Sequence, residues 1–271
     1  MASCAKPVDE VAGCNLPAGE ELKLLWSDEF DGTEINTEIW GFDTADGCQL
    51  GPELCGWGNN ELQYYTSRPE NARVEDGKLI ITAQREIPFY QGYQYTSARM
   101  VTKNKRDFTY GRVDVRAKIP GGGPFGQGIW PAIWMLPTEN VYGIWPKSGE
   151  IDIMEYIGDD PFKMFGTIHY GHDFWRFNSQ YFPTDTINWA EDFHVYSVIW
   201  TEQCIQFQVD GIDMGVANTR STLLPTTWPF DQDFHMILNI AVGGNLPGNP
   251  GFNTTWPQVM EVDYVRVYQE I

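Results

Sequence analysis

The sequence predicts an all-β protein, an antiparallel β-sandwich or jelly roll. Apolar and polar residues alternate with a period of two in many short segments, while the 3.6-residue period of an amphipathic helix is hard to find. The 27 glycines and 17 prolines punctuate these segments and supply turn signals. Many short strands separated by frequent turns are typical of sandwiches and jelly rolls.

The predicted strands follow one another along most of the chain. Residues 112–119, RVDVRAKI, alternate strictly, and residues 204–211, CIQFQVDG, do the same and end in Asp-Gly, a hairpin turn signal. Further strands are expected at 78–84, 194–200, 235–242 and 260–268. Because no internal repeat or linker interrupts this series, we expect one domain at 21–271, preceded by a loose N-terminal extension at 1–20.

Composition restricts the kinds of partner. The chain of 271 residues carries 18 Lys and Arg against 37 Asp and Glu, a formal charge of −19. Such a protein repels nucleic acids and other polyanions, so a neutral ligand suits it better. No stretch approaches the ~20 consecutive apolar residues that a membrane span needs. We expect no nucleic-acid partner, no membrane span and a monomer.

The cysteines suggest disulfides and an oxidising compartment. Cys48 and Cys55 bracket a short loop and are the pair we expect first, and Cys4 and Cys14 bracket another loop and form a second candidate pair. The chain begins with neither a charged nor an apolar leader segment, so we expect that a signal peptide has been removed. Together these features favour a secreted or cell-surface protein.

The segment 150–158, EIDIMEYIG, combines a strand pattern with an irregular spacing of carboxylates. On a regular strand Glu150 and Asp152 share one face, while Glu155 would point into the core, where an unpaired carboxylate costs several kcal/mol. A β-bulge with one extra residue near Met154 would return Glu155 to the face of the other two. Alternatively, the strand ends at Met154 and Glu155 lies in a turn.

Carboxylates crowded on one face have a possible catalytic use. Their mutual repulsion drives their pKa values apart, so that one stays ionised while another holds a proton near neutral pH. Glycoside hydrolysis needs this asymmetry, because one carboxylate attacks the anomeric carbon and another protonates the departing oxygen. The alternative is an ordinary acidic stripe on a solvated strand.

The surroundings favour the catalytic interpretation. Trp130 and Trp134 lie four residues apart just upstream, and Trp145 follows in WPKSGE. Indole rings can stack on the apolar faces of sugar rings in a groove, although several of the 11 tryptophans must belong to the core. The segments GWGNNELQYYT (56–66) and SARM (97–100) add hydrogen-bonding groups that suit a carbohydrate site.

These motifs resemble glycoside hydrolase family 16, and within it the laminarinases, which are endo-β-1,3-glucanases. The resemblance covers nearly the whole chain, with the motifs in family order: WSDEFDG (26–32), GNNELQYYT, ARMVTK (98–103), GRVDVRAKIP, WPAIWMLP, SGEIDIMEYIG, TIHY (167–170) and VDYVRVY (262–268). It implies a concanavalin A-like jelly roll with a carbohydrate cleft on the concave sheet. It also implies a secreted endo-acting enzyme that cleaves β-1,3-glucosidic bonds in laminarin-like glucans by a retaining double displacement.

The resemblance also implies roles for individual residues. Glu150 matches the nucleophile, Glu155 the general acid/base and Asp152 the residue that assists the nucleophile. The spacing E-x-D-x-x-E is similar to the bulged form of laminarinases, agarases and carrageenases, whereas lichenases have E-x-D-x-E. The further positions that resemble sugar-contacting residues, with His169 near the acid/base, are Asn60, Glu61, Arg99, Trp130, Trp134, Trp145 and His169. Without the resemblance, His169 would be read as a strand histidine bonded to the sheet.

Many members of this family hold one structural Ca²⁺ on the convex face, and the matching positions here are Glu29, Gly77 and Asp263. Carboxylates and backbone carbonyls are the oxygen ligands that Ca²⁺ accepts. No cofactor is expected for catalysis. The alternatives for function are a hydrolase of mixed-linkage β-1,3-1,4-glucan or agar, and a non-catalytic β-glucan recognition module.

Overall fold

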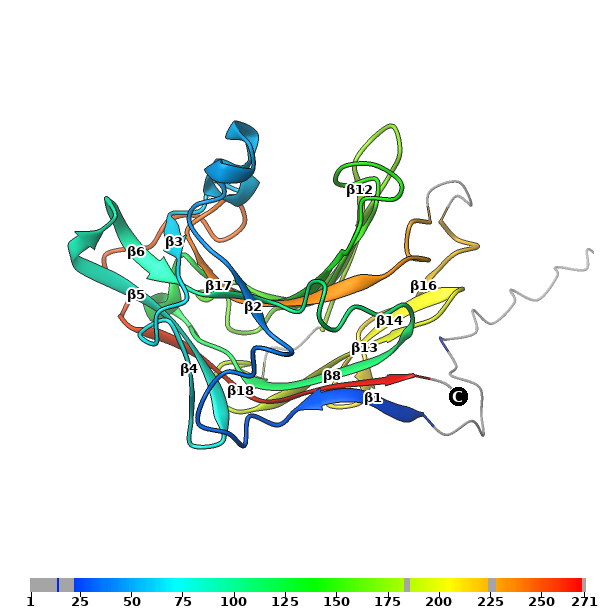
Figure 1. Ribbon diagram of the computed structural model, residues 1–271, viewed down its shortest axis with the longest axis horizontal. Helices are drawn as coiled ribbons and strands as arrows, with labels where there is room; N and C mark the ends of the chain where they lie inside the picture. Colours follow the sequence, from blue (N-terminus) through cyan, green and yellow to red (C-terminus); the bar gives the residue numbers. More distant parts are fainter. Residues whose placement is uncertain (1–13, 15–21, 183–185, 224–227, 270–271) are drawn as a thin grey trace, which may run out of the picture.

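The computed structural model describes residue 14 and residues 22–182, 186–223 and 228–269. They form two packed sheets, which confirms the all-β prediction (Figure 1). Neighbouring strands run antiparallel, apart from the parallel pair β3–β6. In this part of the chain no helix is long and apolar enough to cross a membrane.

The larger sheet has eleven strands, with the order β15-β14-β13-β8-β18-β5-β6-β3; β1 pairs with β18, β16 with β14 and β4 with β5. The strands are β1 (Lys23–Asp28), β3 (Gln63–Tyr65), β4 (Ala72–Glu75), β5 (Lys78–Tyr90), β6 (Tyr93–Ser97), β8 (Gly111–Lys118), β13 (His194–Trp200), β14 (Cys204–Val209), β15 (Ile212–Asp213), β16 (Asn218–Thr219) and β18 (Gln258–Gln269). The Asp-Gly turn is confirmed, because Val209 pairs with Ile212 and the two residues between them both have positive φ.

The smaller sheet has seven strands, in the order β12-β11-β10-β9-β17-β7-β2. They are β2 (Gly41–Asp43), β7 (Arg99–Val101), β9 (Ile129–Pro137), β10 (Glu150–Tyr156), β11 (Met164–Tyr170), β12 (Arg176–Tyr181) and β17 (Phe234–Val242). Its outward face is bordered at one end by the 3-10 helices η1 (Cys48–Leu50) and η2 (Pro52–Gly58), and at the other by the β12 region (Figure 1). A third 3-10 helix, η3 (Pro124–Gly126), precedes β9.

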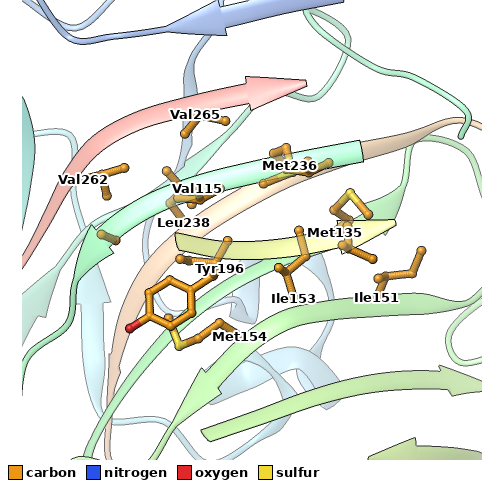
Figure 2. Close-up of a cluster of buried hydrophobic side chains, with 14 of the residues drawn as sticks. Val115, Met135, Ile151, Ile153, Met154, Tyr196, Met236, Leu238, Val262 and Val265 are labelled. Atoms are coloured by element: carbon orange, nitrogen blue, oxygen red, sulfur yellow. The ribbon is translucent and has the colours of Figure 1, made fainter. Parts of the chain in front are cut away.

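Apolar side chains from both sheets meet between them. On β8 the burial alternates strictly, so that Val113, Val115 and Ala117 are fully buried and the charged residues between them face outward. Figure 2 shows Val115 among side chains of the larger sheet, opposite Met236 and others of the smaller sheet. Each fully buried apolar side chain of this size contributes about 1.5–3 kcal/mol, so the interface between the sheets holds the fold together.

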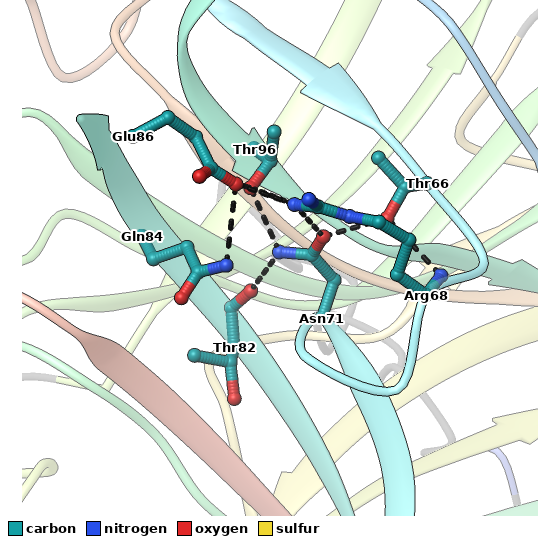
Figure 3. A network of polar contacts seen from close by, with 7 residues as sticks. All are labelled: Thr66, Arg68, Asn71, Thr82, Gln84, Glu86 and Thr96. Carbon is teal, nitrogen blue, oxygen red and sulfur yellow. Dashed lines mark hydrogen bonds and ion pairs between the residues drawn. The ribbon is translucent and has the colours of Figure 1, made fainter. Parts of the chain in front are cut away.

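A hydrogen-bonded network joins the segment between β3 and β4 to β5 and β6, at one end of the larger sheet (Figure 3). Asn71 is completely buried, and its side chain binds Thr82 and Thr96 and accepts from Arg68. Arg68 also forms an ion pair with Glu86. Because a buried amide is stable only when its groups are paired, this network fixes how the segments between the strands lie.

The two disulfides only partly match the sequence prediction. Cys48 and Cys55 are bonded, as predicted, and tie η1 to η2. The candidate pair Cys4–Cys14 is wrong, because Cys14 is bonded to Cys204 at the start of β14, 190 residues away. The rest of the expected extension at 1–20, including Cys4, lies outside the described residues. Chain folding created the second pair, and sequence proximity gave no hint of it.

Candidate active site

The acidic segment forms β10, and the predicted bulge is present. Asp152 lies opposite Trp134 of β9, but Met154 lies opposite Ile133, so the register shifts by one residue between them. The pairing with β11 shifts over the same stretch, between Asp152 and Glu155. The strand continues to Tyr156, which excludes the alternative that Glu155 lies in a turn.

The bulge reconciles an apolar core with an acidic outer face. Ile153 and Met154 are adjacent in sequence, yet both are fully buried (Figure 2). Two consecutive inward side chains use up the extra residue, so Glu155 returns to the outward face with Glu150 and Asp152. Without the bulge, strict alternation would turn Met154 outward and Glu155 into the core.

The three carboxyl groups on this face have little cationic compensation. Asp152 is only 2% exposed, and Glu150 and Glu155 are half-buried. In the described part of the chain the one basic side chain paired with any of them is His169 on β11, whose Nε2 lies 3.1 Å from Asp152 Oδ2. The indole Nε1 of Trp145 donates to Glu150 Oε2 at 2.6 Å. This hydrogen bond favours the ionised form of Glu150.

Burial raises the pKa of all three carboxyl groups. Burial, helped by Asp152, raises the pKa of Glu150 to about 8, and burial raises the pKa of Glu155 to about 7 although His169 opposes the shift. Burial and Glu155 raise the pKa of Asp152 as well. Since each charge also disfavours the next, the three groups cannot all be ionised at neutral pH. The site therefore holds both a protonated and an ionised carboxyl near neutrality, as acid–base catalysis requires.

Two tryptophans of β9 flank the carboxyl groups of β10. Trp130 and Trp134 are half-buried and lie on the same side of the strand, because the residues between them alternate into the core. Trp134 donates from its indole nitrogen to Asn239 at 2.7 Å, whereas the indole of Trp130 lies beside Glu155 and favours its ionised form. Indole rings beside a carboxyl cluster suit the apolar face of a sugar.

Arg99 on β7 organises the tryptophan side of the site. Its guanidinium lies 4.4 Å from the ring centroid of Trp57 and 4.7 Å from that of Trp134. Its Nε donates to Asp43 at 3.1 Å. Trp57 belongs to η2, two residues after Cys55 of the Cys48–Cys55 disulfide. These two cation–π contacts hold an arginine between two indoles and fix the orientation of both.

With this geometry in hand, comparison with known proteins identifies the family. A model described as "Glycosyl hydrolases family 16" matches residues 59–266. The chain belongs to glycosyl hydrolase family 16. The chain is 43% identical over 270 residues to "Glucan endo-1,3-beta-glucosidase A1" of Niallia circulans, covering 94% of this chain and 39% of that protein. It is 45% identical over 261 residues to "Beta-glucanase" of Rhodothermus marinus, covering 91% and 85%.

A solved structure agrees with this assignment. The laminarinase catalytic domain from Thermotoga maritima, crystallised with cetyltrimethylammonium bromide, superposes with a TM-score of 0.82 at 42% identity, covering 93% of this chain and all of that one. The chain is therefore a glycoside hydrolase with the jelly-roll sandwich of family 16. The chain spans the whole of that catalytic domain but well under half of the Niallia protein.

Two predicted sugar contacts of this family 16 hydrolase lie in the loop after η2, and one of them, Glu61, lies near Arg99. Glu61 accepts from Gln63 at 2.7 Å, and burial raises the pKa of Glu61 above its ordinary value. Asn60 donates instead to Asn245, at 2.8 Å, in the loop after β17. The structure thus brings Glu61 to the tryptophan side of the site and engages Asn60 in a contact between two loops.

Two further predicted residues, Trp145 and His169, lie beside the carboxyl groups of β10. The sequence did not predict which side chains they contact there. Trp145 was predicted as a groove residue, but it also donates to Glu150. His169 lies opposite Glu150 in the register of β10 and β11 and contacts Asp152. Sequence reasoning missed Trp57 and Trp175. The only sequence signal for either was an aromatic residue in a Gly-rich or aromatic-rich loop.

A metal ion could find ligands at two places among the described residues. Ligand atoms of Glu150, Asp152 and His169 lie within 4.8 Å of one another. However, the hydrogen bond from Trp145 and the contact between His169 and Asp152 already use this set. The second place is the predicted calcium position on the larger sheet.

The three residues predicted to bind calcium do converge in the hydrolase. β5 pairs with residues 258–262 of β18 and β1 with residues 265–269, so Asp263 lies at the gap between them. Glu29 directly follows β1 and Gly77 directly precedes β5, at the same gap. The register therefore places residues with oxygen donors of the class that Ca²⁺ accepts at one gap in the larger sheet.

Arginines already compensate both carboxylates at that gap. Glu29 accepts from Arg266 through both oxygens, at 2.9 and 2.7 Å, and Asp263 accepts from Arg116 at 2.7 Å. The residues fit Ca²⁺ in position and chemistry, but an ion there would compete with these ion pairs.

Proposed function

We propose that the chain is an endo-acting β-1,3-glucanase that hydrolyses laminarin-like β-glucans with retention of anomeric configuration. The bulge in β10 carries the proposal, because it places three carboxyl groups on one face beside tryptophans. The glucanase names of the relatives at 43% and 45% identity support the linkage. An acidic, aromatic site also suits a neutral glucan better than a sulfated polysaccharide.

In the first step Glu150 attacks C1 of the sugar on the donor side of the scissile bond. A bond forms between its carboxylate oxygen and C1, while the bond from C1 to the glycosidic oxygen breaks and Glu155 protonates that oxygen. Trp145 donates a hydrogen bond to Glu150, and Asp152 lies beside it. Both residues hold the carboxylate oxygens of Glu150 in place. A hydrogen-bond donor already in place at the nucleophile costs no reorganisation during the reaction.

In the second step Glu155, now ionised, removes a proton from water, and the water oxygen attacks C1. The bond to Glu150 breaks, the glucan leaves with a new hydroxyl, and both carboxyl groups return to their starting protonation states. The raised pKa of Glu155, about 7, suits a group that must give and then take a proton near neutrality.

Two alternatives remain to be distinguished by experiment. A hydrolase of mixed-linkage β-1,3-1,4-glucan or of agar would use the same carboxyl groups and differ in the sugar contacts. A non-catalytic recognition module would not need the carboxyl groups, and the presence of all three on one face counts against it.

One set of assays separates these functions. Purified protein is incubated with laminarin, lichenan and agarose, and reducing ends, product sizes and the anomer first formed are followed by chromatography and proton NMR. We expect internal cleavage of laminarin with the β-anomer formed first. Release from agarose alone, or binding to laminarin without new reducing ends, would contradict the proposal.

We also propose a secreted or cell-surface location and a structural Ca²⁺ at the gap between β1 and β5. The two disulfides support an oxidising compartment. The convergence of Glu29, Gly77 and Asp263 supports the ion. Adding EDTA should lower the Tm, and adding back Ca²⁺ should restore it. An unchanged Tm, with no calcium found by elemental analysis, would disprove the ion.

A further inference from the structure

The loop between β11 and β12 folds an indole back onto the active-site histidine. It runs from His169 through the sequence HYGHDFW to Trp175. Gly171 has φ +126°, and a Cβ there would lie 2.0 Å from the carbonyl oxygen of Phe174, so only glycine fits this turn. The turn brings the rings of Trp175 and His169 nearly parallel, with 17° between their planes.

One hydrogen bond and one ion-pair contact connect this loop to the catalytic strand. The indole nitrogen of Trp175 donates to His169 Nδ1 at 3.0 Å, and His169 Nε2 lies 3.1 Å from Asp152 Oδ2. An indole N–H can only donate, so Nδ1 must be the acceptor nitrogen of the imidazole. The ring proton of a neutral His169 is then on Nε2, the nitrogen that lies near Asp152.

We propose that Trp175 is a positioning residue that holds His169 as the neutral Nε2–H tautomer and thereby orients Asp152 beside the nucleophile. This inference rests on the proposed function of the carboxyl groups. An imidazolium, or the Nδ1–H tautomer, would set one N–H against another and lose the Trp175 hydrogen bond.

A neutral His169 matters because of the groups that surround it. Glu150, Asp152 and Glu155 approach it from β10, while His172 and Asp173 of its own loop pair with each other at 2.9 Å. A positive charge on His169 would favour the ionised form of Glu155, which must be protonated to act as the acid. Trp175 therefore keeps the Nε2–H of His169 beside Asp152 without adding a cation to the site.

A simpler role for Trp175 would be to stack on sugar. Its ring is 56% exposed and lies 5.4 Å from the ring of Phe177, which is 58% exposed. Phe177 also contacts the ring of His169, at 6.1 Å, but it has no N–H to donate. The two neighbours therefore form a matched pair, in which one side chain can set the tautomer and both can stack on a ligand.

The test compares Trp175→Phe with Phe177→Leu in the full chain. With ¹⁵N-labelled histidine, NMR at neutral pH resolves which ring nitrogen carries the proton, and the chain has only four histidines. The His169 signals are assigned with His169→Gln. We expect a protonated Nε2 and an unprotonated Nδ1 in the wild type and in Phe177→Leu, and a mixed or doubly protonated ring in Trp175→Phe.

Kinetics on laminarin supply the second measurement. Trp175→Phe should lower kcat about tenfold, the equivalent of one lost hydrogen bond, with little change in KM. Phe177→Leu should raise KM and leave kcat nearly unchanged. Unchanged His169 signals in Trp175→Phe, or a rise in KM alone, would overturn the proposal in favour of simple stacking. If the wild type cleaves no glucan, the proposed function fails, but the NMR comparison still decides the tautomer.

Discussion

Two polar networks in this molecule treat a glutamate in opposite ways. At the end of the larger sheet, Glu86 pairs with Arg68 and accepts from Thr96 and Gln84 (Figure 3). On the outward face of the smaller sheet, Glu150 accepts from Trp145 and has two other carboxyl groups as neighbours. The first carboxylate has a cation and several donors, and the second has one neutral donor.

The pKa values follow from these surroundings. Burial works against the ionised form of Glu86, but its hydrogen bonds to Thr96 and Arg68 outweigh that effect and lower the pKa. Burial and the nearby Asp152 raise the pKa of Glu150 to about 8. The fold thus stabilises the charge of Glu86, which has a structural role. It leaves the charge of Glu150, in the proposed catalytic site, with few compensating partners.

The contrast between the two networks should have its largest effect on catalytic activity. Replacing Glu150 with Gln removes the attacking oxygen and should lower turnover of laminarin by roughly 10⁴-fold or more. Replacing Glu86 with Gln should leave kcat within a few-fold of the wild type, because Glu86 belongs to the other network. Reducing-end assays on both variants check this. A Glu150→Gln protein with most of its activity would refute the role of Glu150.

The pH dependence tests the raised pKa values. Catalysis needs Glu150 ionised and Glu155 protonated. Because the pKa of Glu150 is about 8 and that of Glu155 about 7, the shared proton lies mostly on Glu150, and the productive arrangement is a minor state whose population still peaks between these two pKa values. Below pH 7 both are protonated, and above pH 8 both are ionised, so kcat/KM should peak between about pH 7 and 8 and fall on either side. Initial rates at low laminarin concentration give this profile. A plateau extending from pH 5 to 7 would show that Glu150 ionises at its ordinary pKa.

How far the sequence predicts these networks depends on the range of the interaction. The bulge in β10 followed from residues within one segment, because a carboxylate facing the core at Glu155 would be too costly. The hairpin turn at 210–211 followed from its Asp-Gly signal for the same reason. Local chemistry decides both features, so one segment contains the information.

The features that the sequence did not predict join distant segments. Cys14 meets Cys204 only after β14 has joined the larger sheet. Arg99 sits between Trp57 and Trp134 because β7 and β9 both pair with β17. The short strands β2, β3, β7 and β16 carry too few residues to show a period, and pairing with longer neighbours defines them.

A smaller effect is expected on the free energy of unfolding when the network around Glu86 is weakened. Replacing Glu86 with Gln should lower the free energy of unfolding by about 1–3 kcal/mol, because the charge-assisted bonds from Arg68 and Thr96 are weakened. Since its folded pKa is lowered, the stability that Glu86 contributes is present above its unfolded pKa of about 4.5. It is lost as the pH falls below that value. Urea unfolding at pH 7 and at pH 3 measures this loss, and an equal effect at both would contradict it.

The smallest effect, and the sharpest contrast, is that Glu150→Gln should stabilise the protein it inactivates. A glutamate whose folded pKa is raised costs little stability below pH 4.5, and the cost grows as the pH rises towards about 8, because the folded state resists losing the proton. The variant carries no such cost, although it keeps an oxygen to accept from Trp145. We expect a gain of about 1–2 kcal/mol at pH 8 and almost none at pH 4, measured by urea unfolding. A variant less stable than the wild type at pH 8 would mean that the hydrogen bond from Trp145 outweighs burial, and that Glu150 is compensated as well as Glu86.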